Sequence, residues 1–145
     1  MTGTPQSAEV TILNTAPEMV TGTLSPDTPK TNDVVTATGT ATDPDGDELT
    51  YVYTWTVNGL SVAADGAELD GSVYFDKGDS IAVSIRVTDL DATSDAIDVP
   101  AVLAVNSEPS IEAVTISPEE PVFGSTLRCA ADGFSDPDDD AAHST

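Results

Sequence analysis

The sequence contains very few basic residues. Of its 145 residues, four are Lys or Arg and 26 are Asp or Glu, which gives a formal net charge of −22 at pH 7. A surface this acidic repels nucleic acid and anionic membranes, so we expect neither as a partner. It attracts cations instead, and two origins of the acidity stay open: adaptation to high salt, and carboxylates gathered to bind metal.

Reactive side chains and long apolar runs are also scarce. Cys129 is the single cysteine, so no disulfide forms within the chain, and His143 is the single histidine. The sequence carries no Ser-His-Asp set, phosphate-binding glycine loop or CxxC pair, so we expect no enzyme. No apolar run reaches the roughly 18 residues of a membrane span, and residues 1–10 lack the apolar segment of a signal peptide. Rare lysine and abundant threonine are typical of secreted or cell-surface bacterial proteins, and we expect any secretion signal to lie outside this chain.

The sequence is instead rich in the patterns of β-strands. Three segments combine β-branched and aromatic residues, namely VVTATGTAT (34–42), LTYVYTWTV (49–57) and SIAVSIRVTD (80–89). Residues that favour turns separate them, as in DPDGD and DKGD, and no segment has a helical period. This spacing predicts an all-β fold, an antiparallel β-sandwich. Trp55 shares one strand face with Tyr51 and Tyr53, and we expect this aromatic stripe to pack in the core rather than to bind sugar.

An internal repeat divides the chain. NTAPEMVTGTLSPDTP from Asn14 matches NSEPSIEAVTISPEEP from Asn106, 92 residues later. The repeat predicts the last strand of a preceding repeat or a linker in residues 1–14, a complete sandwich in 15–106, and the first two strands of a truncated next repeat in 107–145.

The spacing of the repeat changes by one residue near its end. Asp43-Pro44-Asp45 recurs as Asp136-Pro137-Asp138, 93 residues later, and we place the extra residue near Phe123 and Gly124. This alignment sets Cys129 opposite Thr36 in the second strand. We expect the thiol there to face the core, with a disulfide partner in the part of the repeat that lies outside the chain.

These motifs carry a resemblance to a known class of module. DPDGDELTYVYTWTVNG (43–59), followed by FDKGDSIAVSIRVTDLDATSD (75–95), resembles the tandem Ig-like repeats of large bacterial extracellular proteins. These repeats include polycystic-kidney-disease-like (PKD-like) and cadherin-like modules. The chain lacks the acidic, glycine-rich turn that follows the tryptophan in the former and the full calcium-binding linker of the latter. The resemblance implies an Ig-like antiparallel β-sandwich that serves as a spacer, an adhesin or an enzyme appendage.

Two acidic loops predict a calcium site. In an Ig-like sandwich, the loop between the second and third strands and the loop between the last two strands meet at one end. Two like charges 4 Å apart cost about 4 kcal/mol at an effective dielectric constant of 20, and a hard cation with six to eight oxygen ligands removes that cost. The predicted ligands are Asp43, Asp45, Asp47, Asp89, Asp91 and the linker residue Asn14. The alternative is a solvated turn, because Asp and Gly favour turns without any metal.

A second calcium site is predicted at the junction with the next repeat. The DKGD turn should lie at the far end of the sandwich, facing the acidic loop of the following unit. Carboxylates placed face to face repel unless a cation bridges them. The predicted ligands are Asp76, Asp79, Asn106, Asp136, Asp138 and Asp140.

The sequence therefore predicts a structural or adhesive module of an extracellular stalk or fibre, made rigid by calcium at the junctions between modules. Its partners would be neighbouring repeats or other copies of the chain. Two alternatives stay open. One is a carbohydrate- or ligand-binding appendage of a secreted enzyme, and the other is a filament subunit that assembles by head-to-tail strand complementation.

Overall fold

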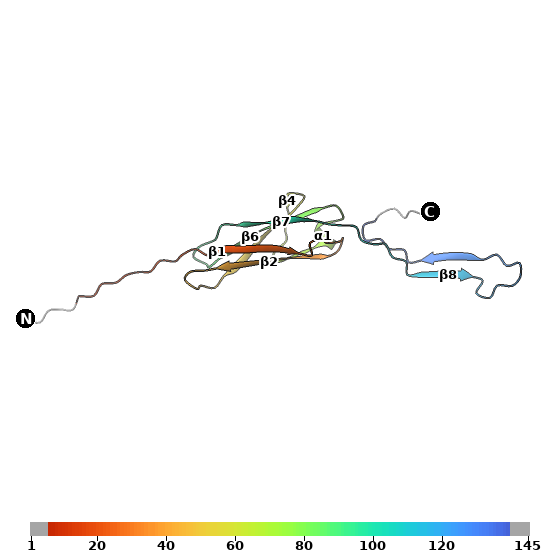
Figure 1. The fold of residues 1–145 in the computed structure, drawn as a ribbon, viewed down its shortest axis with the longest axis horizontal. Helices are drawn as coiled ribbons and strands as arrows, with labels where there is room; N and C mark the ends of the chain where they lie inside the picture. Colours follow the sequence, from red (N-terminus) through yellow and green to blue (C-terminus); the bar gives the residue numbers. More distant parts are fainter. Residues whose placement is uncertain (1–5, 140–145) are drawn as a thin grey trace, which may run out of the picture.

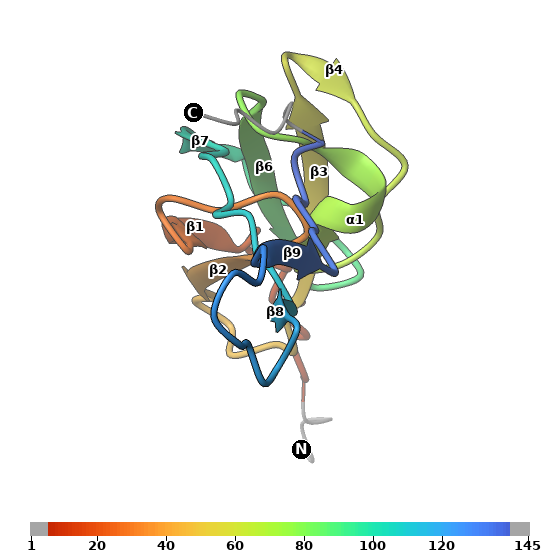
Figure 2. The same cartoon turned by 90° about the vertical axis from the view of Figure 1, so that its right-hand side faces the viewer.

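The protein is an antiparallel β-sandwich followed by a separate β-hairpin. The computed structural model describes residues 6–139. Three strands form one sheet in the order β1-β2-β5, and four form the second in the order β4-β3-β6-β7. Their bounds are β1 Glu18–Ser25, β2 Val34–Thr42, β3 Thr50–Val57, β4 Leu60–Ser61, β5 Glu68–Asp70, β6 Ser80–Thr88 and β7 Ile97–Leu103. The two sheets lie face to face, and their long strands run along the long axis of the molecule (Figures 1 and 2).

The all-β sandwich predicted from the sequence is confirmed. The three predicted strands correspond to β2, β3 and β6, with bounds that differ by at most one residue. The helical content within residues 6–139 is one turn, α1 (Gly71–Tyr74), where the side chain of Asp70 accepts from the backbone N–H of Ser72. No helix in this part of the chain has the length and apolar character that a membrane crossing needs.

The core of the sandwich is built on β6. Its alternate residues Ile81, Val83, Ile85 and Val87 are at most 2 % exposed, because successive side chains of a strand point to opposite faces and only one face meets the other sheet. Trp55 on β3 is fully buried beside them. Its indole N–H donates to the carbonyl oxygen of Gly66 at 3.0 Å. The aromatic stripe is thus core packing, as predicted, and Tyr51 and Tyr53 are half-buried against the same cluster.

A hairpin of two strands, β8 (Ala113–Ser117) and β9 (Arg128–Asp132), extends beyond the sandwich (Figure 1). Its register repeats that of β1 and β2: Ile116 pairs with Cys129 as Leu24 pairs with Ala37. The alignment that set Cys129 opposite Thr36 is therefore wrong by one residue. The reason is that the β1–β2 and β8–β9 connections are equally long, so the extra residue follows β9 instead of lying near residue 123.

One face of this hairpin is apolar and uncovered. Val114 is 62 % exposed and Ile116 is 58 % exposed, whereas Ala37, at the position that Cys129 occupies in the hairpin, is only 2 % exposed. In the sandwich the corresponding strands pack on β6 and β7, and within residues 6–139 the hairpin pairs with no further strand. The division into residues 1–14, 15–106 and 107–145 stays a prediction, and residues 6–17 contain no strand.

We expect the hairpin to be much less stable than the sandwich, because an isolated pair of strands is marginal in water. In native-state hydrogen exchange of a monomeric sample, the amides of β8 and β9 should be protected on the order of 100-fold less than those of β6. Equal protection in both regions would show that the apolar face is covered and that the hairpin is not an incomplete unit.

Candidate metal centre

The loop after β2 folds around one carboxylate. Asp43 Oδ1 accepts hydrogen bonds from the backbone N–H groups of Asp45 at 2.7 Å, Gly46 at 2.9 Å and Asp47 at 3.3 Å. Gly46 has a φ of 80°, in the left-handed region that glycine adopts without steric cost. This turn brings the three alternate aspartates onto one side of the loop.

The three carboxylates form a compact group. Asp43, Asp45 and Asp47 each offer one oxygen, and these oxygens lie within 4.8 Å of one another. Asp43 Oδ2 is buried and has no hydrogen-bond partner among the described residues. A buried carboxylate oxygen without a partner is unfavourable by itself, and coordination to a cation would satisfy it. The oxygen donors of this loop are the type that calcium prefers, so the residues present fit that ion.

A second loop, between β6 and β7, binds the N-terminal segment at the same end of the sandwich. Asp89 is 6 % exposed. Its Oδ1 accepts from the backbone N–H groups of Asp91 at 2.9 Å and Ala92 at 2.6 Å, and its Oδ2 accepts from Asn14 Nδ2 at 3.0 Å. The Asn14 hydrogen bond, followed by that of Ala92, lowers the pKa of the Asp89 carboxyl despite its burial. The backbone N–H of Thr15 donates to Asp45 Oδ2 at 2.6 Å, so the segment is tied to both acidic loops.

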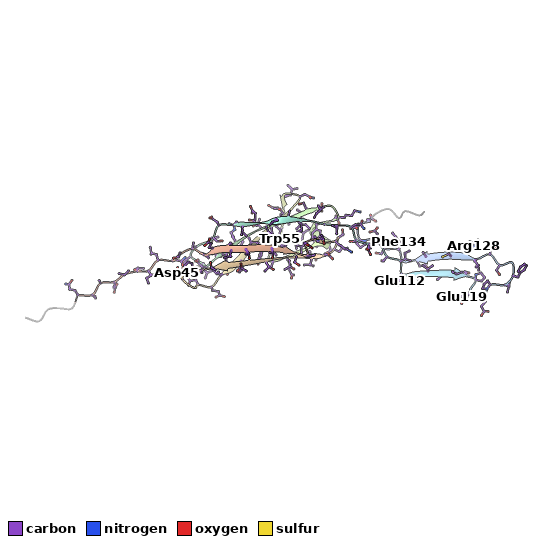
Figure 3. The ribbon with its side chains drawn as sticks, in the orientation of Figure 1. Asp45, Trp55, Glu112, Glu119, Arg128 and Phe134 are labelled. Carbon is purple, nitrogen blue, oxygen red and sulfur yellow. The ribbon has the colours of Figure 1, made fainter. Side chains whose placement is uncertain are left out.

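The electrostatics show that the two loops act on each other. Burial raises the pKa of Asp47, and the charges of four other carboxylates raise it further, those of Asp43, Asp45, Asp89 and Asp91. Asp91 also lines an open hollow together with Asn14, Asp45 and Asp47. The structure thus brings all six predicted ligands to one end of the sandwich, which Asp45 marks in Figure 3. Their role as calcium ligands stays a prediction, since the hydrogen bonds within the Asp43 loop are also those of a metal-free turn.

The DKGD turn lies at the opposite end, because β6 runs the length of the sandwich from this turn to Asp89. Asp79 Oδ1 accepts from Asn58 Nδ2 at 2.7 Å, and Asp79 Oδ2 accepts from the backbone N–H of Asp76 at 2.9 Å. Both oxygens of Asp79 therefore hold the sandwich's own turns together. Within residues 6–139, the Asp43 loop is the one place where three or more potential metal-ligating side chains gather, and Asp76 and Asp79 are not part of such a group.

The segment after β7 meets this end of the sandwich through different contacts. The backbone N–H of Asp138 donates to Asp136 Oδ1 at 3.0 Å, and Asp138 also accepts from the Thr31 hydroxyl and from the backbone N–H of Ser107. The Thr31 hydrogen bond is the main cause that lowers the pKa of Asp138; burial opposes it, and the bond from Ser107 and the charge of Lys77 assist it.

Asn106 lies beside these contacts, where its Oδ1 accepts from Lys77 Nζ at 2.8 Å. Asp140 and His143 lie outside the described residues. The calcium role of the junction aspartates stays a prediction. The sequence did not predict a role for Thr31, Ser107 or Lys77, because they lie in loops and follow no periodic pattern.

The chain matches no protein-family model, no curated protein and no solved structure. The assignment of a role to this centre therefore depends on its geometry.

The bond between Asn14 and Asp89 gives a prediction about pH. Because the folded-state pKa of Asp89 is lowered, the bond contributes stability that is present above the unfolded pKa of about 3.9 and is lost as the pH falls through the folded value. Asn14→Ala should lower the thermal midpoint by a few degrees at pH 7, and the difference from the parent should shrink as the pH falls below about 4. A difference that is constant from pH 7 to pH 2 would contradict this.

The raised pKa of Asp47 gives a second prediction, in which the substitution raises the stability of the fold instead of lowering it. In chelator at pH 7, the other carboxylates disfavour the charged form of Asp47, so Asp47→Asn should raise the thermal midpoint. Asp65→Asn is the matched control, since Asp65 is exposed and lies outside the acidic group. An equal rise in both variants would show that general charge reduction is responsible, and a fall in Asp47→Asn would show that this carboxylate stabilises the metal-free fold.

Proposed function

We propose that this chain is a structural or adhesive module of a repetitive extracellular stalk or fibre, stiffened by calcium at the end that carries Asp43. The observation that supports it most is the buried Oδ2 of Asp43, which has no hydrogen-bond partner within residues 6–139 and lies in a group of five carboxylates. These carboxylates repel one another, and a divalent ion bound among them would remove that repulsion.

Calcium at this position would act on the connection to whatever precedes the sandwich. Asn14 and Thr15 are bound to Asp89 and Asp45, one on each acidic loop. An ion that draws the two loops together would fix the direction in which residues 6–14 leave the sandwich, because the segment is attached to both. Figures 1 and 3 show this segment as an extended strand-like trace that continues the long axis of the sandwich. A rigid exit along that axis suits a spacer in a stalk.

The uncovered face of the hairpin favours a second candidate, the filament subunit. Val114 and Ile116 occupy positions that are packed on β6 and β7 in the complete sandwich. Strands supplied by another copy of the chain would cover them, as in donor-strand complementation. Native mass measured over a range of concentrations separates the two candidates, since only the filament requires self-association. The buried position of Trp55 favours neither a sugar platform nor an appendage built on one.

Calcium should raise the stability of the sandwich. Extracellular modules bind calcium with dissociation constants of about 10⁻⁴ to 10⁻³ M, and tenfold excess over that constant contributes about 1.4 kcal/mol. For a unit of this size the thermal midpoint should rise by roughly 5–10 °C between chelator and millimolar calcium. Scanning calorimetry with Trp55 fluorescence as a second probe measures it.

The variants make this test specific. Asp47→Asn should respond less to calcium than the parent, so that its advantage in chelator disappears or reverses, while Asp65→Asn should respond as the parent does. An unchanged midpoint, or an equal response to magnesium and sodium, would leave only general screening of the acidic surface.

A further inference from the structure

The same hydrogen bond occurs at both ends of the sandwich. At the first end, the backbone N–H of Thr15 donates to Asp45 Oδ2 at 2.6 Å. At the second end, the backbone N–H of Ser107 donates to Asp138 Oδ2 at 2.5 Å. Thr15 follows Asn14 as Ser107 follows Asn106, so the paired residues are equivalent in the repeat. An Asp-Pro-Asp loop therefore holds the linker that precedes its own unit in both cases.

The second loop makes an additional contact that crosses between units. The other oxygen of Asp138, Oδ1, accepts from the hydroxyl of Thr31, which lies in the β1–β2 connection of the sandwich 107 residues away. The ammonium of Lys77 lies close enough to act on the same carboxylate. A carboxylate that accepts from a backbone N–H and a hydroxyl, near a positive charge, is held in one orientation by strong charge-assisted bonds.

The residues that donate hydrogen bonds to Asp138 are themselves buried in the sandwich end. Thr31 and Ser107 are each 6 % exposed. The backbone N–H of Val105 donates to the carbonyl oxygen of Pro29 at 2.7 Å, and Lys30 forms a parallel bridge with Val105. The linker is thereby joined by backbone contacts to the loop that carries Thr31, so Thr31 and Ser107 lie on connected segments.

We propose that the end of the sandwich formed by Thr31, Lys77 and Ser107 is a docking surface for the Asp-Pro-Asp loop of the following repeat, and that this loop fixes the angle between successive repeats. We call the contact of Asp138 with Thr31 and Ser107 the carboxylate latch. The latch needs no metal, so it is independent of calcium at Asp43.

Each unit carries both halves of such a junction. Asp43-Pro44-Asp45 presents the same loop at the other end of the sandwich, where Asp45 is exposed. The partner that this end fits is a unit of the same kind, one that presents a hydroxyl, an ammonium and a linker like those around Asp138. In a row of these repeats, one carboxylate latch at each junction would then join the units head to tail.

Two variants of the complete chain test the latch, and both are measured in chelator. Thr31→Val removes the hydroxyl and keeps the side-chain shape. Asp138→Ala removes the carboxylate, which belongs to a residue outside the sandwich. Asp139→Asn is the control, because Asp139 is exposed. Its φ is 54°, a value that asparagine tolerates as aspartate does. Residual dipolar couplings report whether the sandwich and the hairpin share one orientation, and the thermal midpoint followed by Trp55 fluorescence shows that the sandwich is intact.

In the parent and in Asp139→Asn, couplings from the sandwich and from β8–β9 should fit one alignment tensor. In Thr31→Val and Asp138→Ala, the hairpin couplings should shrink by roughly twofold or more, and the Ser107 amide should exchange on the order of tenfold faster. Retention of one tensor in both latch variants would overturn the proposal. So would a parent hairpin that reorients freely in chelator and becomes fixed only when calcium is added, since an ion would then hold the junction.

Discussion

Burial of the inward face of β6 is the constraint on which the rest of the structure depends. Ile81, Val83, Ile85 and Val87 are enclosed between the two sheets together with Trp55, and burying side chains of this size supplies about 1.5–3 kcal/mol each. A strand filled in this way cannot shift by one residue without turning its aliphatic side chains to solvent. Its ends are therefore fixed, and with them the two places where loops must meet.

At both ends the chain uses aspartate for the same purpose. Asp43, Asp79 and Asp89 each accept hydrogen bonds from backbone N–H groups of nearby turns, and such bonds replace the ladder contacts that are lost where strands stop. The two ends differ in what surrounds the carboxylates. At the Asp43 end they face one another, and the pKa of Asp47 rises. At the junction, Asp138 meets a hydroxyl, a backbone N–H and Lys77, and its pKa falls. Backbone N–H groups donate at both ends, but among residues 6–139 only the Asp43 end gathers several carboxylates within reach of one another.

Much of this could be predicted from the sequence, and the reasons are physical. The alternation in β6 has a period of two, which only a strand with one buried face produces, and the convergence of Asp43 with Asp89 follows from the order of strands in a sandwich. The register of Cys129 was misplaced because a one-residue difference in spacing does not reveal which loop contains it. Thr31 and Lys77 gave no signal, since a hydroxyl and an amine in surface turns are common and only the folded chain shows that Asp138 reaches them.

The direction in which the chain enters and leaves the sandwich has a mechanical consequence. It enters β1 at the Asp43 end and leaves β7 at the other end, so a tensile load applied through the termini of the sandwich acts along the strands (Figure 1). The bonds between β1 and β2 are then loaded in shear and must break together, whereas a sideways pull would open them one by one. β1 also packs closely on β7: a Cβ added at Gly22 would lie 2.7 Å from Val99 Cγ2, which is too close for any side chain. The hydrogen bonds of Asn14 with Asp89 and of Ser107 with Asp138 bear this load first. They would therefore break before the core does.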